Sequence, residues 1–413
     1  MNKPELTESL NLLKFSFESD INIEVKDLDN HGKGEIWVYF DKLLLDVSDL
    51  NLKAQRSRAE YCRFLTERTP TLKDIFDFDT AFSYIVPMAL QALRKGEPVI
   101  ELGQTDKVIV KPAWDLYPLI VSGMPNIWFG DRGSTKSKLA IYAALLMTIH
   151  DLEVTPKLGL IPPSHDLKIL KLDFEVTPDA DEYEWFRIMR GLDMEGAVQL
   201  KYRAIRRPLA DEIESVIEIV NKLAIDLVII DSLGPAAGGD LNTTEPALRF
   251  NEAVRQLNKT TLILAHTAKN QLGKRTVFGS SFYENLARNV WEITKDESED
   301  DGKSLVRIGL KQTKSPPFSA FHCPLAFEWD FEEETERTTI RKYSADKIDS
   351  LMASLSLASK ILSFLASGKK SVRAICDETG EPSNTIRQNL WRLKKAKRIE
   401  KYGEDYGLLS SEE

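Results

Sequence analysis

Only three cysteines, Cys62, Cys323 and Cys376, occur in the 413-residue sequence. Their wide spacing forms neither a disulfide framework nor a metal-ligand pattern, and this favours a reducing, cytoplasmic location. The sequence also lacks a positively charged start followed by an apolar stretch, which is the mark of a signal peptide. Its longest nearly apolar run, residues 139–149, is about half of a membrane span. We therefore expect a cytoplasmic protein without a membrane partner.

The sequence has no excess of positive charge, because its net charge is −9. A chain of this charge is no general binder of polyanions, so any surface for nucleic acid must be local. One such surface is present: residues 383–401 hold seven Lys and Arg against one acid, Glu400. Their local charge of +6 leaves −15 for the remainder of the chain.

The pattern of apolar residues divides the chain into three domains, which we place at 1–112, 113–343 and 344–413. The first is expected to be a small α+β domain, with a hairpin of strands followed by helices at about 55–68 and 79–95. The second alternates strand-like runs with longer helical patterns, which indicates parallel strands joined by crossover helices. The third is mainly helical and ends in a strand, a turn and a strand. The expected fold class is α/β with a mainly parallel central sheet.

Residues 130–137, with the sequence GDRGSTKS, match a nucleotide-binding P-loop, GxxxxGK[ST], except that Thr135 stands where the last glycine is expected. Such a loop is meaningful only between a strand and a helix, and both are predicted here, at 126–129 and 136–149. The N–H groups of the loop and the helix N-terminus would then surround phosphate groups. Thr135 is expected to cost about 1 kcal/mol if its position needs a positive φ. The candidate nucleotide-binding residues are Gly130, Asp131, Arg132, Gly133, Ser134, Thr135, Lys136 and Ser137.

Within this set, two side chains have defined chemistry. Lys136 would reach the β- and γ-phosphates of ATP, and the hydroxyl of Ser137 would help to hold Mg²⁺.

Three further strands are predicted to end in polar residues that suit nucleotide chemistry. The apolar run at 225–234 carries Asp231 near its end, the form of a Walker B strand that faces Mg²⁺. The strand at 167–175 ends in Glu175, and we expect it to lie beside the P-loop strand, where a carboxylate orients and deprotonates water. Another strand ends in His266, which is placed to sense the γ-phosphate. These tips should line one edge of the sheet together with the P-loop.

Three stretches carry a resemblance to a known family: IIDSLGPAAGGDLN at 229–242, LILAHTAKN at 262–270 and GSSFYENLARNVWEI at 279–293. Together with the P-loop and the strand before Glu175, they resemble the RepA-like branch of the RecA-type ATPases, the hexameric plasmid and phage helicase relatives. The resemblance covers about residues 115–330. It implies a RecA-like core that binds ATP and Mg²⁺ between the subunits of an oligomer and acts on DNA.

The resemblance also implies a role for each matching residue. Lys136 and Ser137 match the P-loop lysine and hydroxyl. Glu175 matches the catalytic glutamate, Asp231 the Walker B acid and His266 the sensor histidine.

The sequence departs from this family at the basic residues that act on a neighbouring subunit. The segment LKQTKSPP looks like the strand that carries a lysine–arginine finger, but Thr313 takes the arginine position, with Lys311 and Lys314 beside it. Arg288 and Arg275 are alternative sources of a finger that stabilises charge on the transferring phosphoryl group. The sequence does not choose among them, and Arg288 is carried forward as the candidate catalytic arginine.

The C-terminal region gives an independent indication. Two helices, expected at 371–380 and at 383–398 with serine N-caps, are followed by a strand, a turn and a strand at 399–409. This is the plan of a winged helix-turn-helix, whose second helix lies in the major groove of DNA. The residues suited to bases or phosphates are Asn384, Thr385, Arg387, Gln388, Arg392, Lys394 and Lys395. Winged helices also serve as protein–protein modules, so a structural or oligomerising role stays open.

The sequence therefore predicts a RecA-like P-loop ATPase that forms a homo-oligomer, with a hexamer suggested by the resemblance. Its expected ligands are ATP, Mg²⁺ and DNA, and a helicase of plasmid or phage replication is the first interpretation. One alternative is an ATP-dependent DNA-binding regulator or loader that unwinds nothing. A second is a nucleotide-binding scaffold with negligible turnover, which Thr135 makes conceivable.

Overall fold

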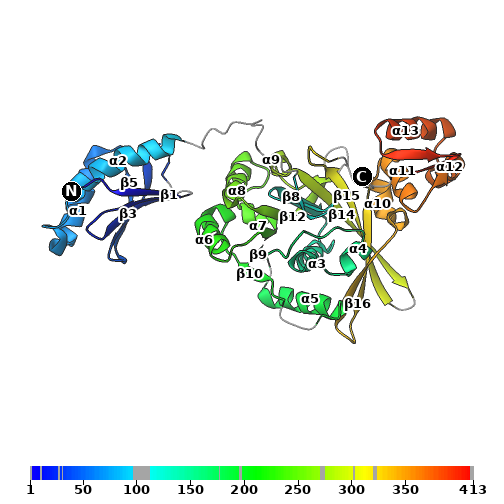
Figure 1. Ribbon diagram of the computed structural model, residues 1–413, viewed down its shortest axis with the longest axis horizontal. Helices are drawn as coiled ribbons and strands as arrows, with labels where there is room; N and C mark the ends of the chain where they lie inside the picture. Colours follow the sequence, from blue (N-terminus) through cyan, green and yellow to red (C-terminus); the bar gives the residue numbers. More distant parts are fainter. Residues whose placement is uncertain are drawn as a thin grey trace. The chain divides into compact units, whose positions relative to one another are not determined.

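The computed structural model describes residues 2–409 except 10–11, 27, 30, 96–111, 176, 195–197, 270–274, 301–302 and 320–322. The chain divides into two compact units, residues 1–109 and residues 110–413, which are described separately (Figure 1). Within the described residues, no helix combines the length and the hydropathy that are needed to cross a bilayer.

The first unit is a five-stranded antiparallel sheet with two helices. Its strands follow one another in space as in sequence: β1 (Glu5–Ser9), β2 (Leu12–Ser16), β3 (Ile21–Lys26), β4 (Lys33–Phe40) and β5 (Leu43–Asn51). The predicted hairpin is confirmed, because β3 pairs antiparallel with β4. Alternate residues of β3 are buried, so one face of the sheet packs on α1 (Gln55–Arg68) and α2 (Phe78–Lys95).

The second unit is built on a ten-stranded sheet in the part of the chain that the structure describes. The strand order is β10–β9–β11–β12–β8–β14–β15–β16–β17, and β13 pairs with β12. The six strands from β10 to β14 are parallel, as predicted, and β14 to β17 continue the sheet in antiparallel pairs. The parallel strands are β8 (Pro125–Gly130), β9 (Ile169–Asp173), β10 (Lys201–Ala204), β11 (Leu227–Asp231), β12 (Thr260–Lys269) and β14 (Asn289–Asp300). The others are β13 (Arg275–Val277), β15 (Lys303–Lys314), β16 (Leu325–Glu332) and β17 (Arg337–Lys342), with a separate small sheet of β6 (Trp114–Leu116) and β7 (Ile120–Val121).

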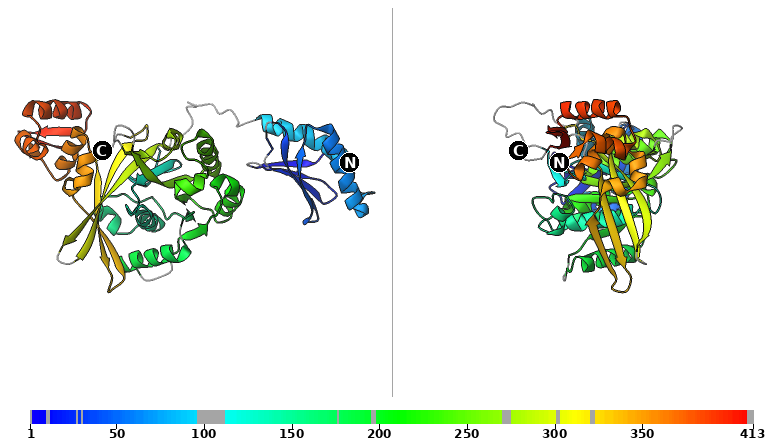
Figure 2. Two further views of the ribbon diagram at one scale, coloured as in Figure 1. Left: turned by 180° about the vertical axis from the view of Figure 1, so that it is seen from behind. Right: turned by 90° about the vertical axis from the view of Figure 1, so that its right-hand side faces the viewer.

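Helices cover both faces of this sheet, and Figure 2 shows them from behind and from the side. One face packs on α3 (Lys136–Thr148) and α5 (Pro178–Gly191), with α4 (Val154–Lys157) nearby. The other packs on α6 (Leu209–Lys222), α7 (Leu233–Ala237), α8 (Thr244–Leu257) and α9 (Ser281–Leu286). The central strands are apolar on both faces because both faces are covered. In β11, Ile229 belongs to the first core and Val228 to the second.

The C-terminal part holds helices followed by a three-stranded antiparallel sheet. The helices are α10 (Asp349–Ser354), α11 (Leu357–Ala366), α12 (Val372–Thr379) and α13 (Ser383–Lys395). The strands β18 (Lys370–Ser371), β19 (Ile399–Tyr402) and β20 (Asp405–Leu408) pair in the order β18–β20–β19. α11 to α13 share a core of their own, whereas Leu351 of α10 packs beneath β15 and β16 with Ala326. The change from one core to the next therefore falls near Leu355, about ten residues after the boundary that we placed at 344.

Candidate active site

The C-terminal ends of the parallel strands bring the predicted residues to one edge of the sheet. β12 lies between β8 and β11, and His266 of β12 is in register with Gly130 at the start of the P-loop. Asp231, the last residue of β11, is in register with Asp173, the last residue of β9. Parallel strands present all of these ends on the same side, which is where ligands bind in open α/β sheets.

One expectation about this edge was wrong. The strand that precedes Glu175 does not lie beside the P-loop strand, because β11 and β12 separate β9 from β8. Glu175 itself follows β9 by two residues, and its backbone N–H donates to Oδ1 of Asp173. The short turn carries Glu175 back toward the P-loop, so it still lines the same cavity as Lys136.

The P-loop runs from β8 into α3, as the sequence predicted. Gly130 has no room for a side chain, since a Cβ there would lie 2.5 Å from the carbonyl oxygen of Ile293. Gly133 has a φ of +72° and faces open space, so its side-chain-free backbone borders the cavity. Thr135 adopts the left-handed conformation, with a φ of 62° and a ψ of 19°, just before the first residue of α3. The threonine therefore occupies a conformation that glycine adopts without strain.

Lys136 is buried, and its ammonium group is held by the loop itself. Nζ donates to the carbonyl oxygens of Gly130 (3.0 Å) and Asp131 (2.9 Å) and to Oγ of Ser134 (3.3 Å). Burial lowers the pKa of Lys136 to about 8, and the nearby carboxylates of Asp231 and Glu175 oppose this shift. Most partners of this ammonium group are neutral carbonyl oxygens, and the charged oxygens of a phosphate would form stronger hydrogen bonds in their place.

Glu175 has two polar neighbours: Ser232 directly follows β11, and His266 is the last residue of β12 that pairs with β8, although β12 continues to Lys269 and does not end at His266 as predicted. The hydroxyl of Ser232 donates to Oε1 of Glu175, and Nε2 of His266 lies 3.9 Å from the same atom. Burial is the main cause that lowers the pKa of His266, followed by repulsion from Lys136. His266, with its lowered pKa and its place between Glu175 and Lys136, is suited to respond to the charge of whatever binds at Lys136.

The cavity at this edge has a volume of about 750 Å³. Its lining includes most of the predicted loop and strand-tip residues, namely Arg132, Gly133, Ser134, Thr135, Lys136, Ser137, Glu175, Asp231 and His266. The open cradle at Gly133 and the buried ammonium fit the phosphates of a nucleotide, and the hydroxyl of Ser137 with the carboxylate of Asp231 fits Mg²⁺. Oxygen donors of this kind, completed by phosphate and water, are the usual surroundings of Mg²⁺.

The far wall of the cavity was not foreseen from the sequence. Lys295, Val306 and Phe331 come from β14, β15 and β16, the antiparallel extension of the sheet. Phe331 stacks on Trp329, with ring centroids 5.9 Å apart, and Nζ of Lys138 lies 4.9 Å from its centre. Alternating apolar residues in 325–332 indicate a strand, but only its pairing shows that the strand borders the P-loop.

Comparison with known proteins agrees with this geometry. Residues 98–272 match a family model described as an AAA domain. This match, which covers less than half of the chain, supports a P-loop ATPase domain. Its mainly parallel sheet, in which one strand separates the P-loop strand from the strand of Asp231, fits the RecA-like P-loop core that the resemblance implied.

No match is found among the curated proteins. Among solved structures, a KaiC-like protein from the hyperthermophilic archaeon Pyrococcus horikoshii OT3 is similar to this chain. It is 13% identical, with a TM-score of 0.37, and the match covers 57% of this chain and 100% of that one.

The candidate finger residues lie in different surroundings. Arg288 is exposed just before β14, and its N–H donates to the carbonyl oxygen of Pro125 at the start of β8. It therefore sits at the sheet edge opposite the P-loop of its own chain. Arg275, in contrast, lies 3.0 Å from Asp131 of its own P-loop and 2.8 Å from the buried Glu292.

The segment at 311–314 is engaged within its own chain. Lys311 donates to the carbonyl oxygen of Ser354 (2.7 Å) and lies 3.5 Å from Glu292. The hydroxyl of Thr313 donates to the carbonyl oxygen of Val290. Lys314 donates to the carbonyl oxygen of Glu284, and repulsion from Arg288 contributes, after burial, to its lowered pKa. Arg288 and Lys314 thus form one cationic spot away from their own P-loop.

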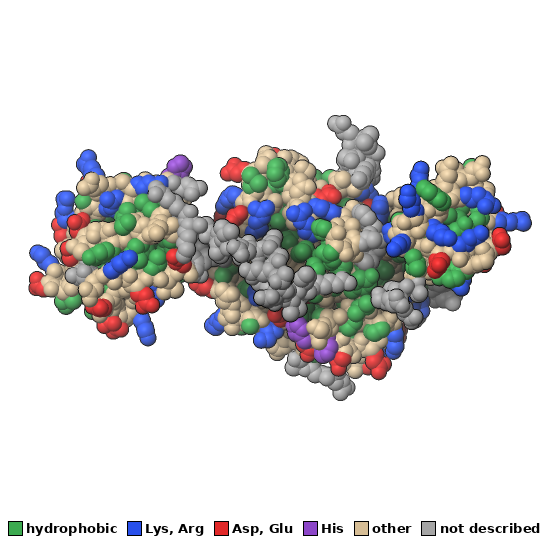
Figure 3. All heavy atoms as spheres, turned by 45° about the horizontal axis from the view of Figure 1, so that its top comes forward, with side chains coloured by type: hydrophobic (Ala, Val, Ile, Leu, Met, Phe, Trp, Pro, Cys, Tyr) green, Lys and Arg blue, Asp and Glu red, His purple; other side chains and the backbone are tan. Residues whose placement is uncertain are grey.

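The predicted DNA-contacting residues lie on α13. Ile386, Leu390 and Leu393 form its buried stripe, and the opposite side is exposed at Asn384, Arg387, Gln388, Arg392, Lys394 and Lys395, with Thr385 half-buried. Figure 3 shows basic side chains gathered on this C-terminal part of the molecule. The sequence reasoning missed Trp391, which is 63% exposed on the same side and has Nζ of Lys395 5.2 Å from its ring.

Proposed function

We propose that this protein is an ATP-hydrolysing, DNA-associated machine of the RecA-like class that works as a homo-oligomer. The observation that carries the proposal is the meeting of Lys136, Asp231 and Glu175 around one cavity at the strand edge. These are a phosphate-binding cation, a carboxylate suited to Mg²⁺ and a carboxylate suited to activate water. Bound Mg²⁺ would supply neutralisation of the charge that develops on the phosphates.

In this proposal each residue of the chain has one task. Lys136 leaves its loop oxygens to bind phosphate. Ser137 and Asp231 hold the ion and its water. Glu175, steadied by the hydroxyl of Ser232, accepts a proton from the attacking water, and His266 responds to the charge at the γ-phosphate position.

DNA is the proposed partner of the C-terminal part, which we interpret as a winged helix with α13 as its recognition helix. Within the described part of the chain, the basic residues of α13 form no ion pair with a carboxylate, so their charge is available to phosphates. Trp391 supports this interpretation, because a large exposed aromatic among cations suits contact with sugar or base.

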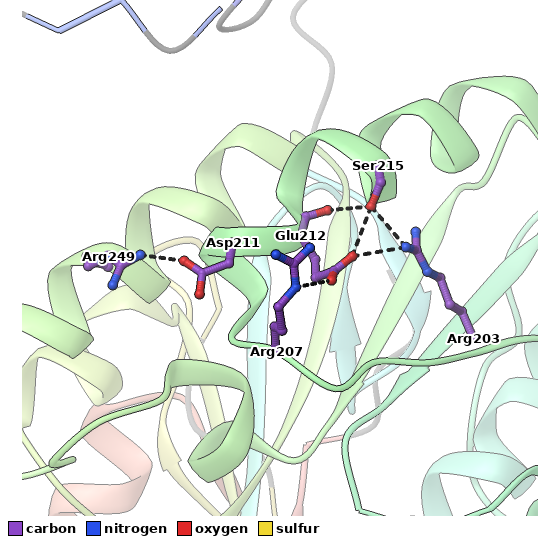
Figure 4. Close-up of polar contacts among 6 residues, drawn as sticks. All are labelled: Arg203, Arg207, Asp211, Glu212, Ser215 and Arg249. Atoms are coloured by element: carbon purple, nitrogen blue, oxygen red, sulfur yellow. Dashed lines mark hydrogen bonds and ion pairs between the residues drawn. The ribbon is translucent and has the colours of Figure 1, made fainter. Parts of the chain in front are cut away.

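A second group of arginines, Arg203 of β10, Arg207 just after it and Arg249 of α8, is different in kind. Figure 4 shows Arg203 and Arg207 paired with Glu212 at distances of 3.1 and 2.8 Å, and Arg249 paired with Asp211 at 2.6 Å. Acids of α6 neutralise these arginines locally. This difference in pairing is why we propose DNA contact at α13, and the paired arginines serve as control residues for the test of that proposal.

Within this class, the first proposal is a helicase of plasmid or phage replication that forms a ring, with a hexamer as the expected size. The second is an ATP-dependent regulator or loader that binds DNA without unwinding it. The second is favoured by the finger strand, where Thr313 replaces arginine and Lys311 is bonded within its own chain.

One combined measurement tests the proposal. Gel filtration with and without ATP gives the assembly state, and ATP turnover is followed on the same fractions with and without DNA. A strand-displacement assay on a forked duplex then separates the helicase from the regulator. A chain that hydrolyses no ATP in any assembly state would refute the proposal.

A further inference from the structure

Lys171 lies in the middle of β9 with a side chain that is 0% exposed. Buried lysines are rare unless they are paired, and here three carboxylates surround one ammonium group. Nζ lies 2.5 Å from Oδ2 of Asp173 and 3.0 Å from Oδ2 of Asp231, and it also contacts Oδ2 of Asp181. One of these three partners is thus the Walker B carboxylate of the candidate active site.

Three elements build this cluster. Lys171 and Asp173 are two residues apart on β9, so they point to the same face of the sheet, the face that packs on α3 and α5. The register of β9 with β11 places Asp173 beside Asp231 on the neighbouring strand. Asp181, in the first turn of α5, is the third carboxylate that contacts Lys171. The fold therefore brings all four charged groups together through ordinary packing.

The charges of the cluster depend on the lysine. Burial favours neutral carboxyl groups and raises the pKa of Asp181, whereas Lys171 opposes that rise. Burial alone would lower the pKa of Lys171, but Asp231 and Asp181 outweigh it and raise that pKa instead. Without Lys171, three carboxylates would repel one another in a buried space.

We propose that Lys171 is a positioning residue that holds the carboxylate of Asp231 in the orientation that Mg²⁺ binding needs. The contact uses Oδ2 of Asp231, which leaves Oδ1 for the cavity that Asp231 lines. The contact fixes Oδ2 on the ammonium group, so the orientation of the Asp231 carboxylate is set before any metal ion arrives. This inference rests on the proposed function, since it assumes that Asp231 assists Mg²⁺ binding.

The test compares the affinity for ATP in the presence of Mg²⁺ and in the presence of EDTA, measured by calorimetry on the full chain. The ratio of the two affinities reports the metal site, whereas the EDTA value reports Lys136 and the loop. For Lys171→Met, we expect this ratio to fall at least about tenfold, the usual loss of metal affinity when a side chain that orients a ligand residue is removed. The EDTA affinity should stay within about twofold of wild type. Lys171→Arg, which keeps the charge, should recover part of the ratio.

A second variant keeps the test decisive if Lys171→Met does not fold. Lys171→Met combined with Asp173→Asn and Asp181→Asn removes two negative charges together with the positive one, so that Asp231 no longer faces two buried carboxylates but still lacks its contact with Lys171. The expected ratio is again reduced. Glu328→Gln is the matched control, because Glu328 is an equally buried acid in the same sheet, paired with Arg307 and outside the cavity. It should leave the ratio unchanged.

The outcomes separate this inference from the proposed function. If wild type binds ATP no better with Mg²⁺ than with EDTA, the role of Asp231 in the proposed function fails first. If wild type shows the enhancement and the Lys171 variants keep all of it, only the positioning role is overturned. Equal loss of affinity with Mg²⁺ and with EDTA would also overturn it, because that result indicates a general structural role.

Discussion

The hydroxyl of Ser232 donates a hydrogen bond to Oε1 of Glu175, so the residue after the Walker B carboxylate holds the proposed water-activating carboxylate. The two residues come from strands that are neighbours in the sheet, β11 and β9. The proposed metal-binding residue and the proposed water-activating residue are therefore connected through a single backbone step, from Asp231 to Ser232.

The first prediction concerns Glu175. Glu175→Gln should keep ATP affinity but lower hydrolysis by at least about 100-fold, because the amide cannot accept the proton of the attacking water. Ser232→Ala should cause a smaller loss, since Glu175 stays charged but is less well held. Single-turnover hydrolysis and calorimetric binding measure the two effects. Glu182→Gln, an exposed acid of α5 outside the cavity, is the control, and full turnover in Glu175→Gln would remove this residue from the reaction.

The second prediction follows from the pKa of Lys136, which lies near 8. Below that pH the lysine already carries the proton that phosphate binding requires. Above it the free protein must take up a proton first, so ATP affinity should fall by up to about tenfold per pH unit. Calorimetry in two buffers of different ionisation enthalpy detects this proton uptake.

A variant with a permanent charge provides the comparison for the pH titration. Lys136→Arg stays charged over the same range, so whatever affinity it retains should not change between pH 7 and 9.5. Wild-type affinity that is constant over that range would contradict the lowered pKa. Lys136→Ala should lose ATP binding at every pH.

The third prediction concerns the strained loop residue. Thr135 has a φ of 62°, so Thr135→Gly should raise the thermal midpoint of the ATPase domain, by an amount that corresponds to about 1 kcal/mol. Thr148→Gly in the same helix should lower it, because Thr148 has helical geometry and donates to the carbonyl oxygen of Ala144. Scanning calorimetry compares the two variants. A lower midpoint for Thr135→Gly would mean that its hydroxyl contributes more than its backbone costs.

The fourth prediction tests the proposed DNA contact of α13. Each Lys or Arg that contacts a phosphate adds about 0.9 to the slope of log affinity against log salt, and we expect about three to five such contacts. Lys394→Ala should lower the slope by about one contact and weaken all sequences equally. Arg387→Ala should also reduce sequence preference, by ~1–3 kcal/mol if the side chain reads a base edge. Trp391→Ala should weaken binding without changing the slope, because an aromatic contact releases no counterion.

Arg207→Ala is the matched control for these variants, because Arg207 is exposed but paired with Glu212 (Figure 4). Its affinity for duplex DNA should equal that of wild type. A chain that ends after Leu355 retains the core beneath β15 but lacks the C-terminal module, which is formed by α11 to α13 and β18 to β20. This shortened chain should bind ATP and lose most of its affinity for duplex DNA. If this truncation takes the oligomer apart and full-length protein binds no duplex at low salt, the module is a protein–protein element.

The fifth prediction concerns catalysis across subunits. Turnover per subunit should rise with protein concentration as the oligomer forms. Arg288→Ala should lower turnover, and mixing it with Glu175→Gln should restore part of the activity, since some interfaces then combine an intact Arg288 with an intact Glu175. Arg255→Ala, on the exposed side of α8, should behave as wild type. A proven monomer with full activity would exclude any residue that acts in trans.

The P-loop and the strand tips could be predicted from the sequence because their evidence is local. An apolar run, a glycine-containing turn and a helix in that order leave few alternatives for residues 126–149. The same reasoning could not place β9, since strand order is decided by pairing between distant segments. Glu175 was therefore assigned to the correct edge but to the wrong neighbour.

The charged cluster below the active site escaped sequence analysis for a physical reason. A lysine within a strand is usually taken for a solvent-facing residue, and only the apolar neighbours of Lys171 hint that both faces of β9 are covered. Asp181 lies ten residues further on, in a helix, so nothing in the spacing links it to Asp231. Phe331 was missed for a similar reason, because β16 reaches the cavity only through its pairing with β15.

The packing of α10 has a consequence for how the C-terminal module is carried. A Cβ at Gly309 of β15 would lie 2.8 Å from Cδ2 of Leu351, so the helix rests directly on the bare backbone of that strand. Two residues further along the same strand, Lys311 donates a hydrogen bond to the carbonyl oxygen of Ser354 in the last turn of α10. The helix before the C-terminal module is thus held on β15 at two points, Gly309 and Lys311. A twist of that strand would therefore move the module with it.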